Sequence, residues 1–348
     1  MLTAKENLVA AITNGKPDRY SNNYEALALM FHPWGARRKP AELGGPAVVD
    51  QWGVSWIWPE GTPGAFPIHD DEHVVLKDIT EWKEYVKAPA LDFSEAEWDV
   101  WRQMYRDFDR SSAICASFVA PGLFEQTHHL GSITEMLMAS ITDTDDYIEL
   151  VKYLTEFELQ LAEGICENLK PEAIFHHDDW GSQDNSFLRP ELFDEIFLEP
   201  YKAIYGYYKD HGVKYIFHHS DSYAANLVPE MIEMGIDVWQ GPMHTNNVPE
   251  LVKQYGDKIS FMGNIDNRFV DFDGFTPEDV KKAAYDCTLG DGLTPEHFIP
   301  CITQGGPGST YPGAYVELVK QIDLLNSEQF GFSVEEIEAA RPPITVMF

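Results

Sequence analysis

Cysteine is scarce in this chain of 348 residues, and its pattern argues against two classes of protein. The four cysteines lie far apart and form no Cys-x-x-Cys pair: Cys115, Cys166, Cys287 and Cys301. This spacing supports neither a disulfide framework nor a zinc site built from thiolates. We therefore expect the protein to reside in a reducing compartment, the cytoplasm.

Long apolar runs are also missing. The sequence contains no stretch of about 18 consecutive apolar residues, so it predicts no membrane span. The first twenty residues, MLTAKENLVAAITNGKPDRY, show the pattern of a capped amphipathic helix rather than that of a secretion signal. Both observations favour a protein that neither enters nor crosses a membrane.

Positive charge is in short supply. The chain has 25 Lys and Arg against 57 Asp and Glu, which gives a net charge of −32. Binding to nucleic acid requires neutralised phosphates, so this balance argues strongly against it. It also disfavours polyanionic substrates, because the one basic cluster is Arg37-Arg38-Lys39. The acidity suits a well-solvated surface, with steering of a less acidic partner protein as a second interpretation.

Short β-like runs alternate with helical patterns of ten or more residues along most of the chain. A first run lies near 21–30, and the later runs are 113–119, 173–175, 215–217, 236–240, 259–262 and 298–302. This alternation predicts an α/β fold with a parallel sheet. About seven units can be counted, which favours a single-domain (β/α)8 TIM barrel over 1–348 with one strand unrecognised. The alternative, an open doubly wound sheet with a dinucleotide site, has no Gly-x-Gly-x-x-Gly motif to support it.

Residues 32–110 break this alternation. Proline, glycine and tryptophan recur there without helical or strand periodicity. We predict an irregular elaboration that acts as a lid over one mouth of the barrel. Within it, the run from His69 to His73 has the composition of a metal cluster, but an exposed turn is the favoured interpretation. His128 and His129, beyond it, are expected to begin a helix.

Polar side chains follow the predicted strands at the points where the strands end. The clearest case is YIFHHSDSYAANLVP at 215–229, where an apolar run turns into His218-His219-Ser220-Asp221 before a helix. In parallel α/β folds the carboxyl ends of the strands line one pocket. The residues at the other ends are Asp178, Asp179, Gln183, Gln240, Asn264, Asp266, Cys301 and Gln304. Simpler interpretations remain for some of them: Asp221 as a helix cap, and Asn264 with Asp266 as a turn.

Several of these blocks resemble one known superfamily. They are Gly15–Arg19, Gly122-Leu123-Phe124-Glu125 ahead of Leu130-Gly131, Asp178–Gln183, His219-Ser220-Asp221, Gly263–Asp266 and Tyr311-Pro312-Gly313. Their order and spacing are similar to those of the uroporphyrinogen decarboxylase superfamily, over most of the chain except 32–110. The resemblance implies a (β/α)8 barrel. It also implies either a cofactor-free decarboxylase or a corrinoid-dependent methyltransferase.

Two branches of that superfamily match the residues poorly. The decarboxylases carry an arginine-rich segment near the N-terminus, whereas the comparable stretch Tyr20–Trp34 has no arginine. The acidic strand ends would also repel a substrate with many carboxylates. The thiol-methylating zinc enzymes use a His-x-Cys pair and a later cysteine. Here His219 matches the histidine, Asp221 replaces the first cysteine, and 305–308 offers no second one.

The remaining branch moves a methyl group from a small methylated compound, such as an aryl methyl ether, to the cobalt of a separate corrinoid protein. In that interpretation His219, Asp221, Asp178 and Asp179 would protonate the departing oxygen. His219 and Asp221 could instead hold a hard metal such as zinc. Contacts with the substrate are predicted for Trp180, Gln183, Tyr223, Trp239, Gln240, Asn264 and Asp266, with ordinary packing as the alternative for the aromatics. A decarboxylase of a smaller substrate and a non-catalytic ligand-binding barrel are the other hypotheses.

Overall fold

The structure is a computed structural model that describes residues 1–37, 40–62 and 64–343. Arg38 and Lys39 of the basic cluster lie outside this range. A parallel sheet of seven strands forms the centre, in the order β1-β5-β6-β7-β8-β9-β10. The strands are β1 (Leu27–Met30), β5 (Ile114–Val119), β6 (Ala173–His177), β7 (Tyr215–His219), β8 (Val238–Gln240), β9 (Ser260–Ile265) and β10 (Phe298–Ile302). The order follows the chain, as expected for successive β-α units.

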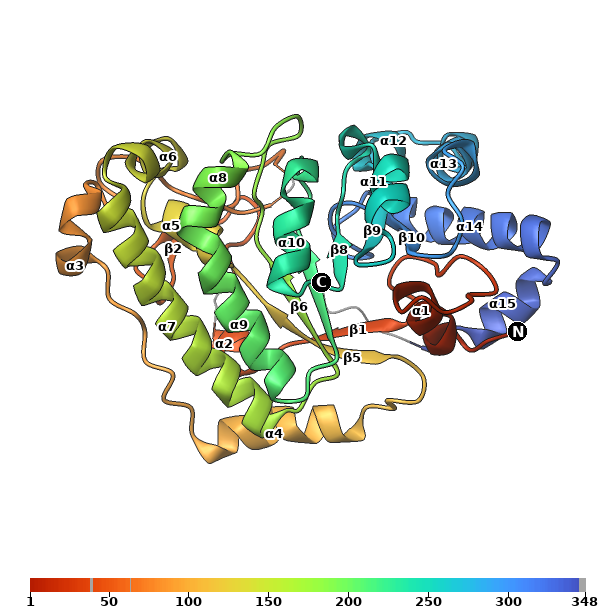
Figure 1. The fold of residues 1–348 in the computed structure, drawn as a ribbon, viewed down its shortest axis with the longest axis horizontal. Coiled ribbons are helices and arrows are strands. Elements are labelled where there is room, and N and C mark those ends of the chain that lie inside the picture. The colour runs from red at the N-terminus through yellow and green to blue at the C-terminus, as the bar shows by residue number, and fades with distance from the viewer. Residues whose placement is uncertain (38–39, 63, 344–348) are drawn as a thin grey trace.

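Helices surround this sheet on its outer side (Figure 1). The longer ones are α1 (Ala4–Ile12), α4 (Glu95–Asp107), α5 (Leu123–Leu130), α6 (Ile133–Thr142), α7 (Thr144–Asn168), α9 (Glu199–Asp210), α11 (Val248–Tyr255), α13 (Pro277–Tyr285) and α14 (Ala314–Phe330). The shorter ones are α2 (Pro33–Arg37), α3 (Trp82–Tyr85), α8 (Pro190–Phe193), α10 (Val228–Met234), α12 (Asn267–Val270) and α15 (Val334–Ala340). Single turns are η1 (Ile79–Glu81), η2 (Asp194–Leu198), η3 (Ala225–Leu227), η4 (His244–Asn246) and η5 (Asp286–Gly290). None of the helices in the described part combines the length and apolarity needed to cross a bilayer.

The sheet curls around a core to which every one of its strands contributes. One buried cluster contains side chains from all seven strands, among them Leu29, Ala116, Phe175, Phe217, Val238, Met262 and Ile299. The two edges of the sheet are joined through Asn23, just ahead of β1. Its backbone N–H donates to Pro300 O of β10 (3.0 Å), and its side-chain oxygen accepts from Ile302 N–H (2.9 Å). The parallel α/β architecture is therefore confirmed. However, the described residues form seven strands in this sheet and not the eight expected.

The helices begin at the capping signals that the sequence carries. Thr3 and Glu6 form a complete capping box at α1, and Ser132 accepts from Glu135 N–H at α6. The apolar stripe of α7 and the tyrosines of α9 are buried against the outer face of the sheet, where they form a second large core cluster. Amphipathic faces of this kind supply most of the stability of a helix in a folded protein.

The segment 32–110 contains more regular structure than predicted. Three short antiparallel strands form a small sheet: β2 (Val48–Val49), β3 (Ser55–Ile57) and β4 (Phe66–Pro67). Helix α4 follows with a capping box between Ser94 and Glu97. Figure 1 shows β2 and α4 at opposite ends of the large sheet. The expectation of an irregular segment was wrong for α4, because its capping box was not recognised.

Candidate active site

Strands β6 and β7 end in matching pairs of histidines. Both strands run two residues further than predicted, so that His176 pairs with His218 and His177 pairs with His219 in register. Because side chains alternate between the two faces of a strand, each pair divides. His177 and His219 line a cavity inside the curled sheet, with ring centroids 4.4 Å apart. His176 and His218 are fully buried on the outer side, where Tyr205 of α9 bonds to both.

The cavity lies at the carboxyl ends of the strands and has a volume of about 650 Å³. Its lining includes aromatic and apolar side chains: Tyr24, Trp56, Phe66, Phe118, Ile133, Phe175 and Phe187. It also includes acidic and imidazole groups: Glu125, His128, His129, His177, Asp179, His219 and Asp221. None of the described residues that line it is lysine or arginine. The loop with Gln304 and Ser309 and the β3–β4 part of the N-terminal segment complete the wall.

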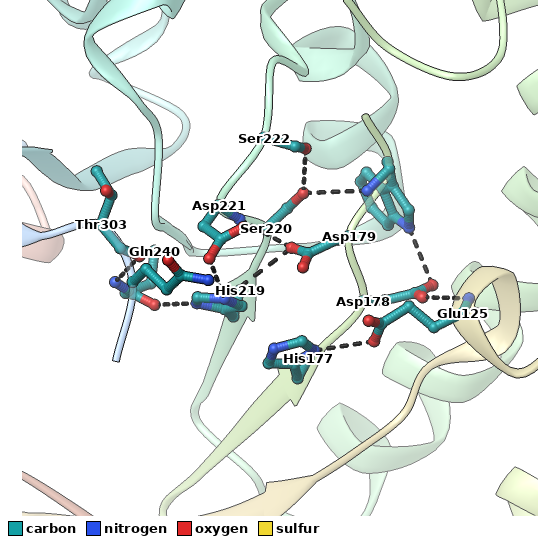
Figure 2. Close-up of polar contacts among 12 residues, drawn as sticks. Glu125, His177, Asp178, Asp179, His219, Ser220, Asp221, Ser222, Gln240 and Thr303 are labelled. Atoms are coloured by element: carbon teal, nitrogen blue, oxygen red, sulfur yellow. Dashed lines mark hydrogen bonds and ion pairs between the residues drawn. The ribbon is translucent and has the colours of Figure 1, made fainter. Parts of the chain in front are cut away.

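Five of these polar groups lie close together (Figure 2). Oε2 of Glu125 is 2.9 Å from Nδ1 of His177. Nε2 of His219 lies 4.0 Å from an oxygen of Asp179 and 3.9 Å from one of Asp221. The two aspartates are also linked, because the backbone N–H of Asp221 donates to Asp179 at 2.8 Å. We call Glu125, His177, Asp179, His219 and Asp221 the inner cluster.

Burial and neighbouring charges shift the pKa values of the inner cluster in different directions. Burial lowers the pKa of His177, but the Glu125, Asp179 and Asp221 carboxylates outweigh it and raise this pKa to about 10. Burial and the neighbouring His177 lower the pKa of His219 to about 4. Burial, together with the adjacent Asp179 carboxylate, raises the pKa of Asp221 well above its usual range. At neutral pH, His177 is therefore an imidazolium and His219 is neutral, while Asp221 holds a proton more readily than an ordinary carboxyl group does.

Gln240 fixes the tautomer of His219. The amide nitrogen of Gln240 points at the backbone oxygens of Ile302 (3.3 Å) and Thr303 (3.4 Å). Because those oxygens can only accept, the amide oxygen of Gln240 is the atom that faces Nδ1 of His219. Nδ1 must therefore carry the hydrogen, and Nε2 presents its lone pair toward the two aspartates. Gln240 is fully buried, and it positions His219 rather than contacting the cavity itself.

Asp178 does not join the inner cluster, although it precedes Asp179 directly. It is fully buried and accepts hydrogen bonds from the backbone N–H groups of Phe124 (3.0 Å) and Glu125 (2.7 Å), at the first turn of α5. The indole N–H of Trp180 (3.0 Å) and the hydroxyl of Tyr201 donate to it as well. Burial and the Glu125 carboxylate raise the pKa of Asp178, against these donors. We correct its predicted catalytic role: Asp178 anchors the helix that presents Glu125.

Gly122 makes this anchoring possible. A Cβ atom at Gly122 would lie 2.5 Å from Cβ of Asp178 and 2.6 Å from a ring carbon of His176. No side chain fits in that space, so only glycine allows the start of α5 to approach the end of β6 so closely. The block Gly122–Glu125 is thus explained by packing against β6.

The predicted aromatic walls are not in the cavity. Trp180 is buried against His218, with ring centroids 3.9 Å apart. Trp239 is buried on the outer side and donates its indole N–H to Ser220 O (2.9 Å). Tyr223 and the exposed Gln183 do not line the cavity either. For the two tryptophans the structure favours packing over substrate contact, and Gln183 and Tyr223 lie on the loops after the strands, outside the cavity lining.

Asn264 and Asp266 also turn outward at the end of β9. Asn264 has a left-handed backbone (φ 70°) and donates to Cys287 O and Asp291, both at 2.9 Å. Asp266 caps α12 and pairs with Arg268 at 2.7 Å. Their predicted substrate contacts are therefore replaced by the simpler interpretation, a turn that ends the strand. Among the residues predicted from sequence, the cavity receives Asp179, His219, Asp221 and Gln304, with Gln240 directly behind His219.

Glu125 and His177 were not among the predicted site residues. The strand β6 was expected to end at Phe175, which left the direction of His177 open. Glu125 lies in the first turn of the helix after β5, a position that faces the pocket in parallel α/β folds. His128 and His129 also line the cavity, and they lie in the last turn of α5 instead of beginning a helix. The run His69 to His73 forms a turn in which His73 contacts Asp70 (2.6 Å), in line with expectation.

A curled parallel sheet with titratable groups gathered at the carboxyl ends of its strands defines a TIM-barrel-like α/β protein with a candidate active site. The protein-family model of uroporphyrinogen decarboxylase (URO-D) matches residues 128–320, more than half of the chain. The chain therefore belongs to the uroporphyrinogen decarboxylase family, and the predicted family is confirmed.

One solved structure shows the same architecture. A methyltransferase from Methanosarcina mazei superposes with a TM-score of 0.62 at 13% identity, covering 93% of this chain and 99% of that one. At this identity the likeness is one of fold. A sugar phosphate isomerase/epimerase from Parabacteroides distasonis (12% identity, 71% and 81% coverage) and a D-psicose 3-epimerase (13%, 72% and 82%) reach TM-scores of only 0.31 and 0.32.

Proposed function

We propose that this protein transfers a methyl group from a small O-methylated donor, such as an aryl methyl ether, to the cobalt of a corrinoid bound to a separate protein. The family assignment and the shared fold with a methyltransferase support a transferase of this kind. The observation that carries the proposal is the inner cluster. In it, Asp221, a carboxyl group whose pKa burial raises, lies beside the lone pair of His219 inside a cavity that is partly lined by aromatic side chains.

The reaction determines what the chain itself must supply. The reduced cobalt of the corrinoid provides the electron pair that attacks the methyl carbon. The C–O bond breaks, its electron pair stays on oxygen, and that oxygen needs a proton. Asp221 can donate this proton to the oxygen. Asp179 lies beside both Asp221 and His219, where its negative charge would stabilise a proton held by His219. All four cysteines are buried and none lines the cavity, so the site offers no thiolate as an alternative nucleophile.

The cavity suits a flat, small donor. Phe118 and Phe175 are stacked at 5.8 Å with an angle of 26°, and both line the cavity beside the histidines of the inner cluster. A volume of about 650 Å³ lies within the range of small-molecule pockets. Phe66 of β4 lines the same cavity and is 48% exposed, so the N-terminal segment contributes to the mouth. In this proposal the segment 32–110 acts as the lid, and the corrinoid protein docks at this mouth.

The test is methyl transfer to a reduced corrinoid. Purified protein is mixed with reduced corrinoid protein and a panel of methoxylated aromatics, and the cobalt absorption spectrum is followed. We expect methylation of the cobalt with at least one donor, and a rate roughly 10²–10⁴-fold lower for Asp221→Asn, the range typical of a lost general acid. Asp273→Asn, the same change at an exposed position, serves as the control and should keep full activity. The proposal fails if no donor methylates the cobalt, or if Asp221→Asn is as active as Asp273→Asn.

A decarboxylase acting on a small substrate is the second candidate. The His177 imidazolium could bind one carboxylate, and the family contains decarboxylases. A substrate with many carboxylates is disfavoured, because the described lining contributes no lysine or arginine and three carboxyl groups. Release of carbon dioxide from a monocarboxylate without any corrinoid would favour this candidate over methyl transfer.

A further inference from the structure

We propose that His128 selects the methyl donor by forming hydrogen bonds with a hydroxyl group on the ring of the donor, which is therefore a methoxyphenol. The inference rests on the proposed function, because it names the class of donor that binds in the same cavity. His128 lines that cavity from the last turn of α5. The proposed transfer of the methyl group gives this residue no step of its own.

His128 differs from the histidines of the inner cluster in its hydrogen bonds. Nδ1 of His177 bonds to Glu125 at 2.9 Å, and Nδ1 of His219 bonds to Gln240. Within residues 1–37, 40–62 and 64–343, by contrast, the His128 ring forms no hydrogen bond to another residue. A polar group that lines a cavity without a protein partner is available to a ligand, and a ligand that covers it without pairing with it binds less tightly.

Aromatic contacts hold the His128 ring in place. Phe124, one turn earlier on α5, meets it edge to face with ring centroids 5.3 Å apart, and His129 packs against it at 4.9 Å. Phe124 is itself stacked on Phe187, which also lines the cavity, at 5.7 Å and an angle of 20°. The imidazole is thus oriented before a ligand arrives, so a hydrogen bond to it costs little additional side-chain entropy.

The N-terminal segment covers this turn of α5. Trp56 contacts the His129 ring at 4.9 Å, and Nε2 of His69 lies 3.4 Å from the backbone oxygen of His129. The backbone N–H of Leu76 donates to Leu130 O at 2.9 Å. His128 is half-buried at the place where this segment meets the cavity. A hydrogen bond between a ligand and His128 would therefore be partly shielded from water, which strengthens it.

The chemistry of a neutral imidazole matches that of a hydroxyl group. Burial lowers the pKa of His128, and the Glu125 and Asp179 charges offset this only in part, so the ring is neutral at neutral pH. A neutral imidazole offers one N–H donor and one acceptor nitrogen, and a hydroxyl group can pair with either. A carboxylate can only accept, and it would add a negative charge near Glu125 and Asp179. A methyl substituent forms no hydrogen bond at all.

Binding of donors without any corrinoid tests this inference. The 2-, 3- and 4-methoxyphenols are titrated calorimetrically into the full chain, each beside the methylanisole in which a methyl group replaces the hydroxyl. We expect at least one pair in which the methoxyphenol binds roughly tenfold more tightly, the factor that about one hydrogen bond contributes. His128→Phe keeps an aromatic ring and removes the hydrogen bond, so it should abolish this preference.

Further variants separate recognition of the hydroxyl from packing. His128→Gln keeps an amide donor and acceptor and should retain part of the preference. His211→Phe, the same change at an exposed histidine after α9, should retain all of it. A loss of packing alone would weaken both members of a pair and leave the ratio of their dissociation constants unchanged. Thermal unfolding shows that each variant is folded, and His128→Leu replaces His128→Phe if the larger ring prevents folding.

Each result supports or overturns the role of His128. A preference that His128→Phe abolishes and His211→Phe retains supports it. No binding of any methoxyphenol, no preference in the wild type, or an unchanged preference in His128→Phe overturns it. The cobalt spectrum tests the proposed function separately. Methyl transfer with an unchanged preference in His128→Phe removes only the role of His128, whereas a preference that depends on His128 without methyl transfer removes only the proposed reaction.

Discussion

Strands β6 and β7 present two layers of the same residues in opposite environments. On the inner layer, His177 and His219 face a cavity together with Asp179 and Asp221. On the outer layer, His176 and His218 are sealed between the sheet and the helices. The hydroxyl of Tyr205 lies 3.2 Å from Nδ1 of His176 and 2.9 Å from Nδ1 of His218. Neighbouring residues on the same strand therefore have different roles: one histidine faces the candidate active site, and the histidine before it supports the fold.

The outer layer supports the inner one directly. Nε2 of His218 lies 3.2 Å from the backbone oxygen of Asp178, the residue before Asp179. Burial lowers the pKa of His218 well below its usual range, so this histidine is neutral and donates through Nε2. His176 has a second partner on α7, because its Nε2 lies 3.1 Å from Oε2 of Glu158. The hydrogen bonds behind the strands thus fix the backbone from which the cavity carboxylates project.

Substitutions of two adjacent aspartates, one on each layer, test the difference between the layers with the largest expected effects. Asp179→Asn removes a carboxylate from the inner cluster, so we expect the methyl-transfer rate to fall by about 10²–10⁴-fold. The free energy of unfolding should change little, because the amide oxygen can still accept from Asp221 N–H. Rates and urea unfolding measured on the same preparation check this. Strong destabilisation with an unchanged rate in the folded protein would assign Asp179 to structure.

The same substitution at Asp178 should mainly lower stability, whereas at Asp179 it should mainly lower the rate. Asp178→Asn leaves one acceptor oxygen where two oxygens meet four donors, and it turns an amide N–H₂ toward buried N–H groups. We expect the protein to lose about 1–3 kcal/mol of unfolding free energy for each buried donor left unpaired. Urea unfolding gives this value. If Asp178→Asn unfolds like the wild type, Asp178 does not anchor α5.

These opposite roles explain what the sequence could and could not predict. The order of strands and helices and the location of the site follow from periodicity and from the polar residues at strand ends. The direction of each side chain does not, because β6 and β7 were expected to end at Phe175 and Phe217. Two more residues of strand decide that His177 and His219 face inward. Likewise, Asp178 turns outward because Trp180, Tyr201 and the start of α5 offer it donors, and these come from distant segments.

The position of Glu125 could not be predicted from the sequence either. The block Gly122–Glu125 was visible in the sequence, but only the close approach of α5 to β6 brings its carboxylate to His177. Trp180 and Trp239 were expected in the cavity, although packing was the stated alternative. Their indole N–H groups bond to Asp178 and Ser220 on the outer side. The aromatic wall is instead formed by residues inside the sheet, such as Phe118 and Phe175.

The charge of the inner layer predicts which donors bind. A carboxylated methoxyarene would bring a further negative charge near Asp179 and Glu125, whereas an uncharged methoxyphenol would not. Like charges a few ångströms apart in a partly buried site cost more than 1 kcal/mol, so we expect about tenfold weaker binding of the carboxylated donor. Calorimetry at equal ionic strength compares the two. Tighter binding of the carboxylate would show that the His177 imidazolium dominates the field, and would favour the decarboxylase candidate.

The smallest expected effect concerns the proton on His177. Its pKa is raised from 6.5 to about 10, because the Glu125, Asp179 and Asp221 carboxylates outweigh the effect of burial. The folded protein therefore holds a proton that the unfolded chain releases above its ordinary pKa. The resulting stability is fully present below pH 6.5 and is lost as pH rises through about 10. His177→Gln should show a shallower fall in unfolding free energy over this window. The pKa of Asp221 is also raised, and the His177 charge lowers it, so the same pair of curves measured in an Asp221→Asn background separates the two groups. Parallel curves would mean that His177 is neutral in the cavity, and that the charges of the inner layer are balanced in another way.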